Sequence, residues 1–92
     1  MINSRNIVYH ELIGLYAEVN DSNTESLIGI SGNIIDETKK TLLIETNNGE
    51  KLIPKNVSIF QFKLPDGNWV EINGKILLNR PEDRIKKRYK KI

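Results

Sequence analysis

The sequence predicts a mainly β protein, a small antiparallel SH3-like barrel of five or six strands with a short helix at each end. Three observations support this fold class. Apolar and polar residues alternate over short runs, as in strands that bury one face. Turn-forming residues interrupt these runs at intervals of about 8–12 residues. The chain has 92 residues, 38% of them hydrophobic and 28% charged, which suits one domain with a single modest core.

The first predicted element is a helix over residues 6–13. Asn6 can cap its start, and Gly14 can take the left-handed conformation that closes a helix. Ile7, Leu12 and Ile13 supply its apolar residues. Because two helical turns are not stable alone, this face must dock on something else. If this face docks on another protein, the predicted interface consists of Ile7, Leu12 and Ile13 together with nearby strand residues.

The strands follow from residue 15 onward, where the hydrophobic period changes to two. Gly29 and Gly32 lie inside an apolar run and indicate strong bending or a bulge, which helps a small sheet to curl. The turns are predicted at residues 36–40, at Asn47-Asn48-Gly49 and at Pro65-Asp66-Gly67. The strand segments lie at residues 15–20, 27–35, 41–46, 50–54, 57–64, 68–73 and 75–78. These segments together span about residues 15–79. We predict that they close into a barrel, because closure of the sheet leaves little unpaired edge.

The last 13 residues differ in charge from the rest of the chain. Residues 80–92 hold seven of the 14 Lys and Arg residues and only two carboxylates, a net charge of +5. Residues 1–79 hold seven cations and ten carboxylates, a net charge of −3. Pro81 and the acidic residues after Asn79 suit the first turn of a helix, and the cations follow towards its C-terminal end. Such asymmetry indicates a polyanionic partner, most often nucleic acid, with a solubilising tail as the alternative.

No constellation of residues predicts catalysis by the chain itself. Cysteine is absent, which excludes disulfides and thiolate zinc sites. His10 is the only histidine, and it has no sequence partner that would tune it for acid–base work. Asp36 and Glu37 could hold Mg²⁺ through water, but a solvated turn is the commoner role of such a pair. We therefore predict no catalytic residue, no metal site and no cofactor on this chain.

The remaining candidates are cations that can neutralise phosphate. Ordinary solvation explains each lysine in the body of the chain when it is considered singly. When the lysines are considered as one set on a barrel, solvation and nucleic-acid binding explain them about equally well. No hydrophobic run approaches the length of a membrane helix or follows the N-terminus as in a signal peptide, so we expect a cytoplasmic protein without membrane contact. The predicted nucleic-acid-binding residues are Lys39, Lys40, Lys51, Lys55, Arg80, Arg84, Lys86, Lys87 and Arg88. For Arg80 and Arg84 a protein interface is the alternative, and the sequence does not decide between the two surfaces.

Several segments, taken in order, resemble one known family. They are His10-Glu11-Leu12-Ile13-Gly14-Leu15, Gly29-Ile30-Ser31-Gly32, Ile35-Asp36-Glu37-Thr38, Thr41-Leu42, Phe60-Gln61-Phe62, Ile72-Asn73-Gly74 and Arg80-Pro81-Glu82-Asp83-Arg84-Ile85-Lys86-Lys87. The ordered set resembles archaeal ribonuclease P protein component 1, the archaeal relative of the eukaryotic Pop4-type subunit. The likeness extends from about residue 7 to residue 88.

The resemblance implies a six-stranded Sm-like or SH3-like barrel in a ribonucleoprotein that removes 5′ leaders from precursor tRNA. It implies that the RNA of this endoribonuclease performs Mg²⁺-assisted hydrolysis, and that the chain binds and stabilises that RNA. The implied partners are ribonuclease P RNA, a zinc-ribbon protein subunit in a heterodimer, other ribonuclease P proteins and, indirectly, precursor tRNA. The alternatives are an Sm-like or ribosomal RNA-binding barrel without a role in tRNA processing, and a stand-alone nuclease at Asp36 and Glu37.

Overall fold

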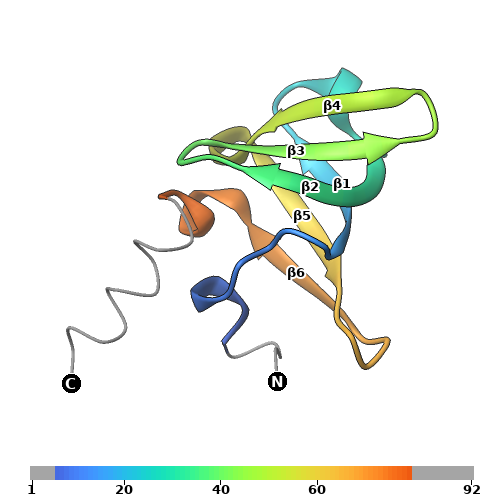
Figure 1. The fold of residues 1–92 in the computed structure, drawn as a ribbon. Coiled ribbons are helices and arrows are strands. Elements are labelled where there is room, and N and C mark those ends of the chain that lie inside the picture. Colours follow the sequence, from blue (N-terminus) through green and yellow to red (C-terminus); the bar gives the residue numbers. More distant parts are fainter. Residues whose placement is uncertain (1–5, 80–92) are drawn as a thin grey trace.

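A computed structural model describes residues 6–79 of the chain, and six antiparallel strands dominate it (Figure 1). The strands follow the order β4-β3-β2-β1-β5-β6 across one sheet. Short 3₁₀ turns connect or flank them. The elements are η1 (Ile7–Tyr9), β1 (Tyr16–Ser22), η2 (Glu25–Leu27), β2 (Ser31–Glu37), β3 (Thr41–Thr46), β4 (Gly49–Pro54), η3 (Lys55–Val57), β5 (Ser58–Lys63), β6 (Trp69–Asn73) and η4 (Gly74–Leu77).

The sheet is open, because β4 and β6 pair on one side only. The six antiparallel strands predicted from the sequence are confirmed, but closure into a barrel is wrong for the described residues. Two register irregularities bend the sheet, between Val19 and Asp21 in β1 and between Ile34 and Asp36 in β2. An extra residue in one strand of a pair increases the local twist. These two bulges therefore contribute curvature to the open sheet.

The two glycines expected at a bulge have other roles. Gly29 has φ +89° and lies in the turn that precedes β2. Gly32 lies in β2, where a Cβ would stand 1.9 Å from the Glu45 carbonyl oxygen. Only glycine allows β2 and β3 to approach this closely.

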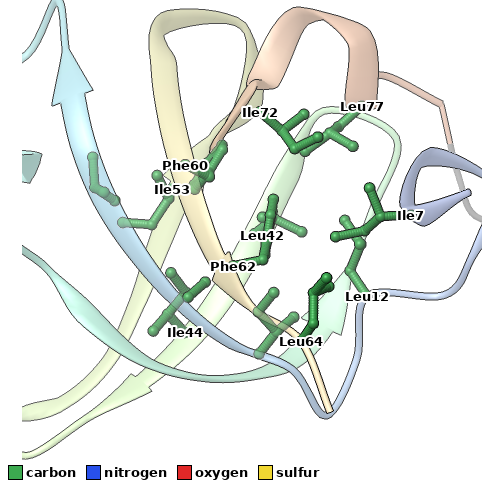
Figure 2. Close-up of a cluster of buried hydrophobic side chains, with 13 residues drawn as sticks. Ile7, Leu12, Leu42, Ile44, Ile53, Phe60, Phe62, Leu64, Ile72 and Leu77 are labelled. Atoms are coloured by element: carbon green, nitrogen blue, oxygen red, sulfur yellow. The ribbon is translucent and has the colours of Figure 1, made fainter. Parts of the chain in front are cut away.

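One hydrophobic cluster fills the concave side of the sheet, and all six strands contribute to it. Figure 2 shows side chains from strands distant in sequence, such as Leu42 and Phe62, meeting in this cluster. Phe60 and Phe62 stack with their ring centroids 5.8 Å apart. The predicted alternation of residues 57–64 is confirmed, because Ser58, Phe60, Phe62 and Leu64 are all buried.

The N-terminal segment is a single 3₁₀ turn followed by extended chain, in place of the helix expected over residues 6–13. Ile7 and Leu12 are five residues apart, so a helix would place them on different faces. Extended backbone after η1 lets both side chains reach the core (Figure 2). Each side chain is 0% exposed there. Packing thus overrides the weak helical pattern.

The C-terminal end of the described chain also differs from the expected strand at residues 75–78. Asn73 Oδ1 accepts a hydrogen bond from Lys75 N at 3.0 Å and starts the 3₁₀ turn η4. The three-residue period of such a turn brings Gly74 and Leu77 inward together, and both are buried. The helix expected over residues 80–92 lies outside the described residues. None of the helical turns in residues 6–79 is long or apolar enough to cross a membrane.

Candidate nucleic-acid interface

A buried ion pair lies beneath the turn that joins β2 to β3. Lys55 Nζ donates to Glu37 Oε2 at 2.7 Å, and both side chains are 0% exposed. Lys55 Nζ also donates to the carbonyl oxygens of Thr38 at 2.7 Å and Asn79 at 3.2 Å. The other carboxylate oxygen, Glu37 Oε1, accepts from Leu12 N at 3.4 Å. The ammonium group thus has three acceptors, which is the condition for keeping a charge in the core.

This pair corrects two expectations from the sequence. Lys55 cannot reach a phosphate, because it is enclosed by protein, so it does not belong to the nucleic-acid-facing set. Glu37 is not part of a solvated turn, since β2 continues to this residue and its carboxylate is buried. Lysine and glutamate are rarely buried unless they are paired. No local pattern in the sequence connects the two residues, which lie 18 positions apart.

The same buried contacts fix the backbone of the turn. Three consecutive carbonyl groups accept hydrogen bonds from the interior: Thr38 O from Lys55 Nζ, Lys39 O from Asn79 N at 2.9 Å, and Lys40 O from Lys55 N at 2.8 Å. On the outside, Thr41 N donates to Thr38 Oγ1 at 3.1 Å. With its carbonyls held from within, this segment has little conformational freedom left to lose on binding.

The side chains of Lys39 and Lys40 are exposed on this fixed turn. Asn79, the last described residue, donates its N–H to the Lys39 carbonyl oxygen of the turn, and its own carbonyl oxygen accepts from Lys55 Nζ beneath the turn. The strongly basic segment of residues 80–92 therefore starts next to the two lysines. The structure thereby brings Lys39 and Lys40 to the origin of that segment, whose candidates Arg80, Arg84, Lys86, Lys87 and Arg88 lie outside the described residues.

Lys51 is exposed but lies elsewhere on the β3–β4 hairpin. It pairs in register with Ile44, whereas Pro54 pairs with Thr41 beside the turn. Three residues of strand separate the two positions, about 10 Å. Lys51 instead borders a hollow lined by Ile28, Ile30 and the tip of the hairpin. Of the four lysines predicted from the body of the chain, the structure groups only Lys39 and Lys40.

The three residues predicted to face a protein partner are also separated. Ile7 and Leu12 belong to the core and are 0% exposed, so they cannot form an interface. Ile13 points out of the core with 42% of its surface exposed. Only Ile13 therefore remains from this predicted set.

Residues 6–79 contain no cluster of three or more His, Cys, Asp or Glu side chains that could hold a metal ion. Asp36 is exposed at its strand position and Asp36 Oδ1 accepts from Glu37 N at 2.8 Å. Glu37 is already paired with Lys55. The two carboxylates therefore do not form a joint site for a metal-dependent nuclease.

Sequence reasoning missed an aromatic contact on the outer surface. The rings of Tyr16 and Trp69 meet edge to face with centroids 6.1 Å apart, and their exposed fractions are 39% and 43%. Lys63 lies between them in the register of β1, β5 and β6. The two rings lie more than 50 residues apart in the sequence, so no local pattern indicates their contact. The only signal in the sequence is the presence of a single tryptophan.

Comparisons with known proteins agree on one family. A family model described as ribonuclease P/MRP, subunit p29, matches residues 5–87. Ribonuclease P protein component 1 of Methanosphaera stadtmanae is 52% identical over 92 residues, which cover 100% of this chain and 99% of the relative. The protein of that name from Methanothermobacter thermautotrophicus is 47% identical over 92 residues, with 99% of each chain covered.

A solved structure, described as Mth11, a homologue of human RNase P protein Rpp29, shares 47% identity with this chain. It superposes with a TM-score of 0.59 over 83% of this chain and 99% of the other. The sequence match thus covers nearly the whole chain, and the fold agrees with it. The chain therefore belongs to the p29 family of ribonuclease P/MRP subunits, in which its archaeal relatives are named ribonuclease P protein component 1.

Proposed function

We propose that this chain, a protein subunit of the endoribonuclease ribonuclease P, binds the RNA of the particle through one basic end of its fold. That end consists of the Lys39–Lys40 turn and the segment of residues 80–92. In this proposal the RNA performs the Mg²⁺-assisted hydrolysis that removes 5′ leaders from precursor tRNA in the cytoplasm. The chain then needs no catalytic residue, metal or cofactor of its own.

One observation carries this proposal: two exposed lysines stand on a turn whose carbonyls are fixed from the core, at the origin of a segment with a net charge of +5. Cations held in a fixed array neutralise phosphates that would otherwise repel one another. Such neutralisation stabilises a compact RNA and lowers the concentration of Mg²⁺ that the RNA needs. Omission of the chain should therefore impair cleavage most at low Mg²⁺.

The proposal is tested by neutralising the turn. The variant Lys39→Gln/Lys40→Gln should lose two phosphate contacts. The slope of log K, where K is the association constant for the RNA, against the logarithm of the salt concentration should therefore become shallower by about 1.4–1.8. The matched control, Lys63→Gln/Lys75→Gln, removes the same charge from exposed lysines elsewhere in the fold. Its slope should remain that of the unaltered protein. Filter binding to the cognate RNA measures both slopes. If the two variants had equal slopes, only the net charge of the protein would matter, and the proposed binding site at the turn would be refuted.

We also propose a heterodimer with the zinc-ribbon protein subunit of the particle, in which the exposed Ile13 contributes to the interface. Its support is the exposure of a large apolar side chain directly after a segment anchored in the core by Ile7 and Leu12. The change Ile13→Ser should weaken association with that subunit in calorimetry and leave the folded structure intact. The alternative of an Sm-like or ribosomal barrel unconnected with tRNA finds no support in the family to which the chain belongs.

A further inference from the structure

The convex face of the sheet, opposite the core, carries two rows of side chains on β1, β5 and β6. The first row is Tyr16, Lys63 and Trp69, which are direct cross-strand neighbours. The second row, two residues further along each strand, is Glu18, Gln61 and Glu71. The intervening residues of these strands point to the core, as the burial of Ala17 and Phe62 shows. The two rows therefore form one outward-facing surface, here called the aromatic–acidic face.

The first row continues beyond Tyr16 through Asn33 on β2 to two carboxylates. Glu45 on β3 lies directly opposite Glu50 on β4. Like charges in such a position are destabilising when nothing compensates them. Within residues 6–79 the only side-chain ion pair is that of Lys55 with Glu37, so neither carboxylate is neutralised there. Tyr16, Asn33, Glu45 and Glu50 line a shared hollow of about 500 Å³.

The charge of this face opposes that of the basic end. On the face and its continuation over β2, β3 and β4, a single lysine, Lys63, is accompanied by four carboxylates, those of Glu18, Glu45, Glu50 and Glu71. This potential repels a phosphate backbone, although the two rings alone could stack on an unpaired base. An arginine side chain satisfies both features, because its guanidinium group stacks on aromatic rings and binds carboxylates with two parallel hydrogen bonds.

We propose that the aromatic–acidic face is the docking surface for a cationic, arginine-bearing segment of another protein subunit of the particle. The inference rests on the proposed assembly with further protein subunits and is independent of the RNA contacts at the Lys39–Lys40 turn. It gives the molecule two functional sides: a basic end for RNA and an acidic, aromatic face for protein.

The test is site-specific photo-crosslinking in the particle reconstituted from the cognate RNA and its protein subunits. Benzoylphenylalanine replaces Trp69 in one preparation and Lys40 in another. The probe at position 69 should cross-link to a protein subunit, and the probe at position 40 should cross-link to RNA. A cross-link from position 69 to RNA, or to no component at all, would overturn the docking surface. If only the probe at position 40 failed to cross-link to RNA, the proposed RNA contact would be contradicted and the proposed docking surface would not be affected.

Trp69 provides a second measurement because it is the only tryptophan of the chain. Addition of the other protein subunits without RNA should quench or blue-shift its fluorescence, whereas addition of the RNA alone should leave the emission unchanged. The reverse pattern would refute the inference. In the titration with protein subunits, Glu18→Gln and Glu71→Gln should each weaken binding by up to about fivefold. The matched change Glu25→Gln, at an exposed carboxylate in η2, should leave binding unchanged.

Discussion

At the scale of single residues, the most consequential side chain is Lys55, which acts through what it holds in place. Its ammonium group joins Glu37 at the end of β2 to the carbonyl oxygens of Thr38 and Asn79. Glu37 in turn accepts from Leu12 N. One buried cation therefore connects the N-terminal segment, the β2–β3 turn and the last described residue.

Removal of that cation should be costly, because it leaves a carboxylate buried without a partner. The change Lys55→Met should lower the free energy of unfolding by about 3–5 kcal/mol. The double change Lys55→Met/Glu37→Met should recover part of this loss, since no isolated charge remains in the core. Urea denaturation measures both effects, with Lys51→Met as an exposed control expected within about 0.5 kcal/mol of the unaltered protein. Equal losses for Lys55→Met and Lys51→Met would show that the pair contributes nothing.

The buried pair of Lys55 and Glu37 could not be predicted from the sequence. The strand that contains Phe60 and Phe62 was predicted correctly at residues 57–64, because alternation along one strand is a local pattern. Lys55 was assigned to the surface because its partner Glu37 comes close only after β2 and η3 have packed together. A lysine and its eventual partner carry no mark of each other in a single sequence, so burial of such a pair emerges only from the tertiary structure.

At the scale of elements, close contact between η3 and η4 supports the turn that carries Lys39 and Lys40. A Cβ on Gly74 would stand 1.8 Å from the Lys55 carbonyl oxygen and 2.8 Å from that of Ser58. Backbone atoms cannot move aside as a flexible side chain can. The absence of a side chain at Gly74 therefore lets η4 lie against η3 and directs Asn79 to the turn.

The change Gly74→Ala should separate these two elements. We expect a loss of about 1–3 kcal/mol or more in the free energy of unfolding, the cost of overpacking a site with no room. Hydrogen exchange should also become faster at Asn79 N and Lys55 N, whose acceptors belong to the turn. Ser26→Ala, in the exposed turn η2, serves as the control and should change neither quantity. If Gly74→Ala destabilised the protein but left hydrogen exchange at these two amides unchanged, Gly74 would not be needed for the geometry of the turn.

The N-terminal segment allows stability and association to be distinguished. Leu12→Ala removes a fully buried side chain and should cost about 2–5 kcal/mol of stability. Ile13→Ala truncates a side chain that is 42% exposed and should cost less than about 1 kcal/mol. Thermal unfolding of the two variants measures this difference. Similar losses at both positions would contradict the assignment of Leu12 to the core and Ile13 to the surface.

Elements were predictable from the sequence where local chemistry alone determines them. The turns at Asn47-Asn48-Gly49 and Pro65-Asp66-Gly67 were predicted from their residue types, and Gly49 and Gly67 indeed adopt positive φ, at +104° and +92°. The two ends of the described residues, η1 and η4, were not predictable in this way, since their conformation brings Ile7 and Leu77 into a core that the strands create. The open edges of the sheet escaped prediction for a similar reason: closure depends on the register of β4 and β6, which short alternating runs do not specify.

At the scale of the whole molecule, the net charge of +2 conceals a separation of charge. The last 13 residues carry +5, and the part before them carries −3. Within the fold, Lys39 and Lys40 lie beside Asn79, where the basic segment begins, while Glu18, Glu45, Glu50 and Glu71 share the convex face of the sheet. A molecule so divided can orient itself on a polyanion through the basic end before any close contact forms.

This division predicts how binding to RNA depends on salt. Eight candidate cations remain once Lys55 is excluded, and engagement of five or six of them gives a slope of log K against log salt of about −4 to −5. Replacement of Arg84, Lys86, Lys87 and Arg88 by Gln should make the slope shallower by about 3, whereas Lys39→Gln/Lys40→Gln should change it by about half as much. The two effects should add, because each released counterion contributes separately to the slope. Binding isotherms with the cognate RNA between 50 and about 300 mM salt measure all three values. A slope that stays near zero in the unaltered protein would mean that phosphate contacts do not drive the association, and the basic end would lose its assigned role.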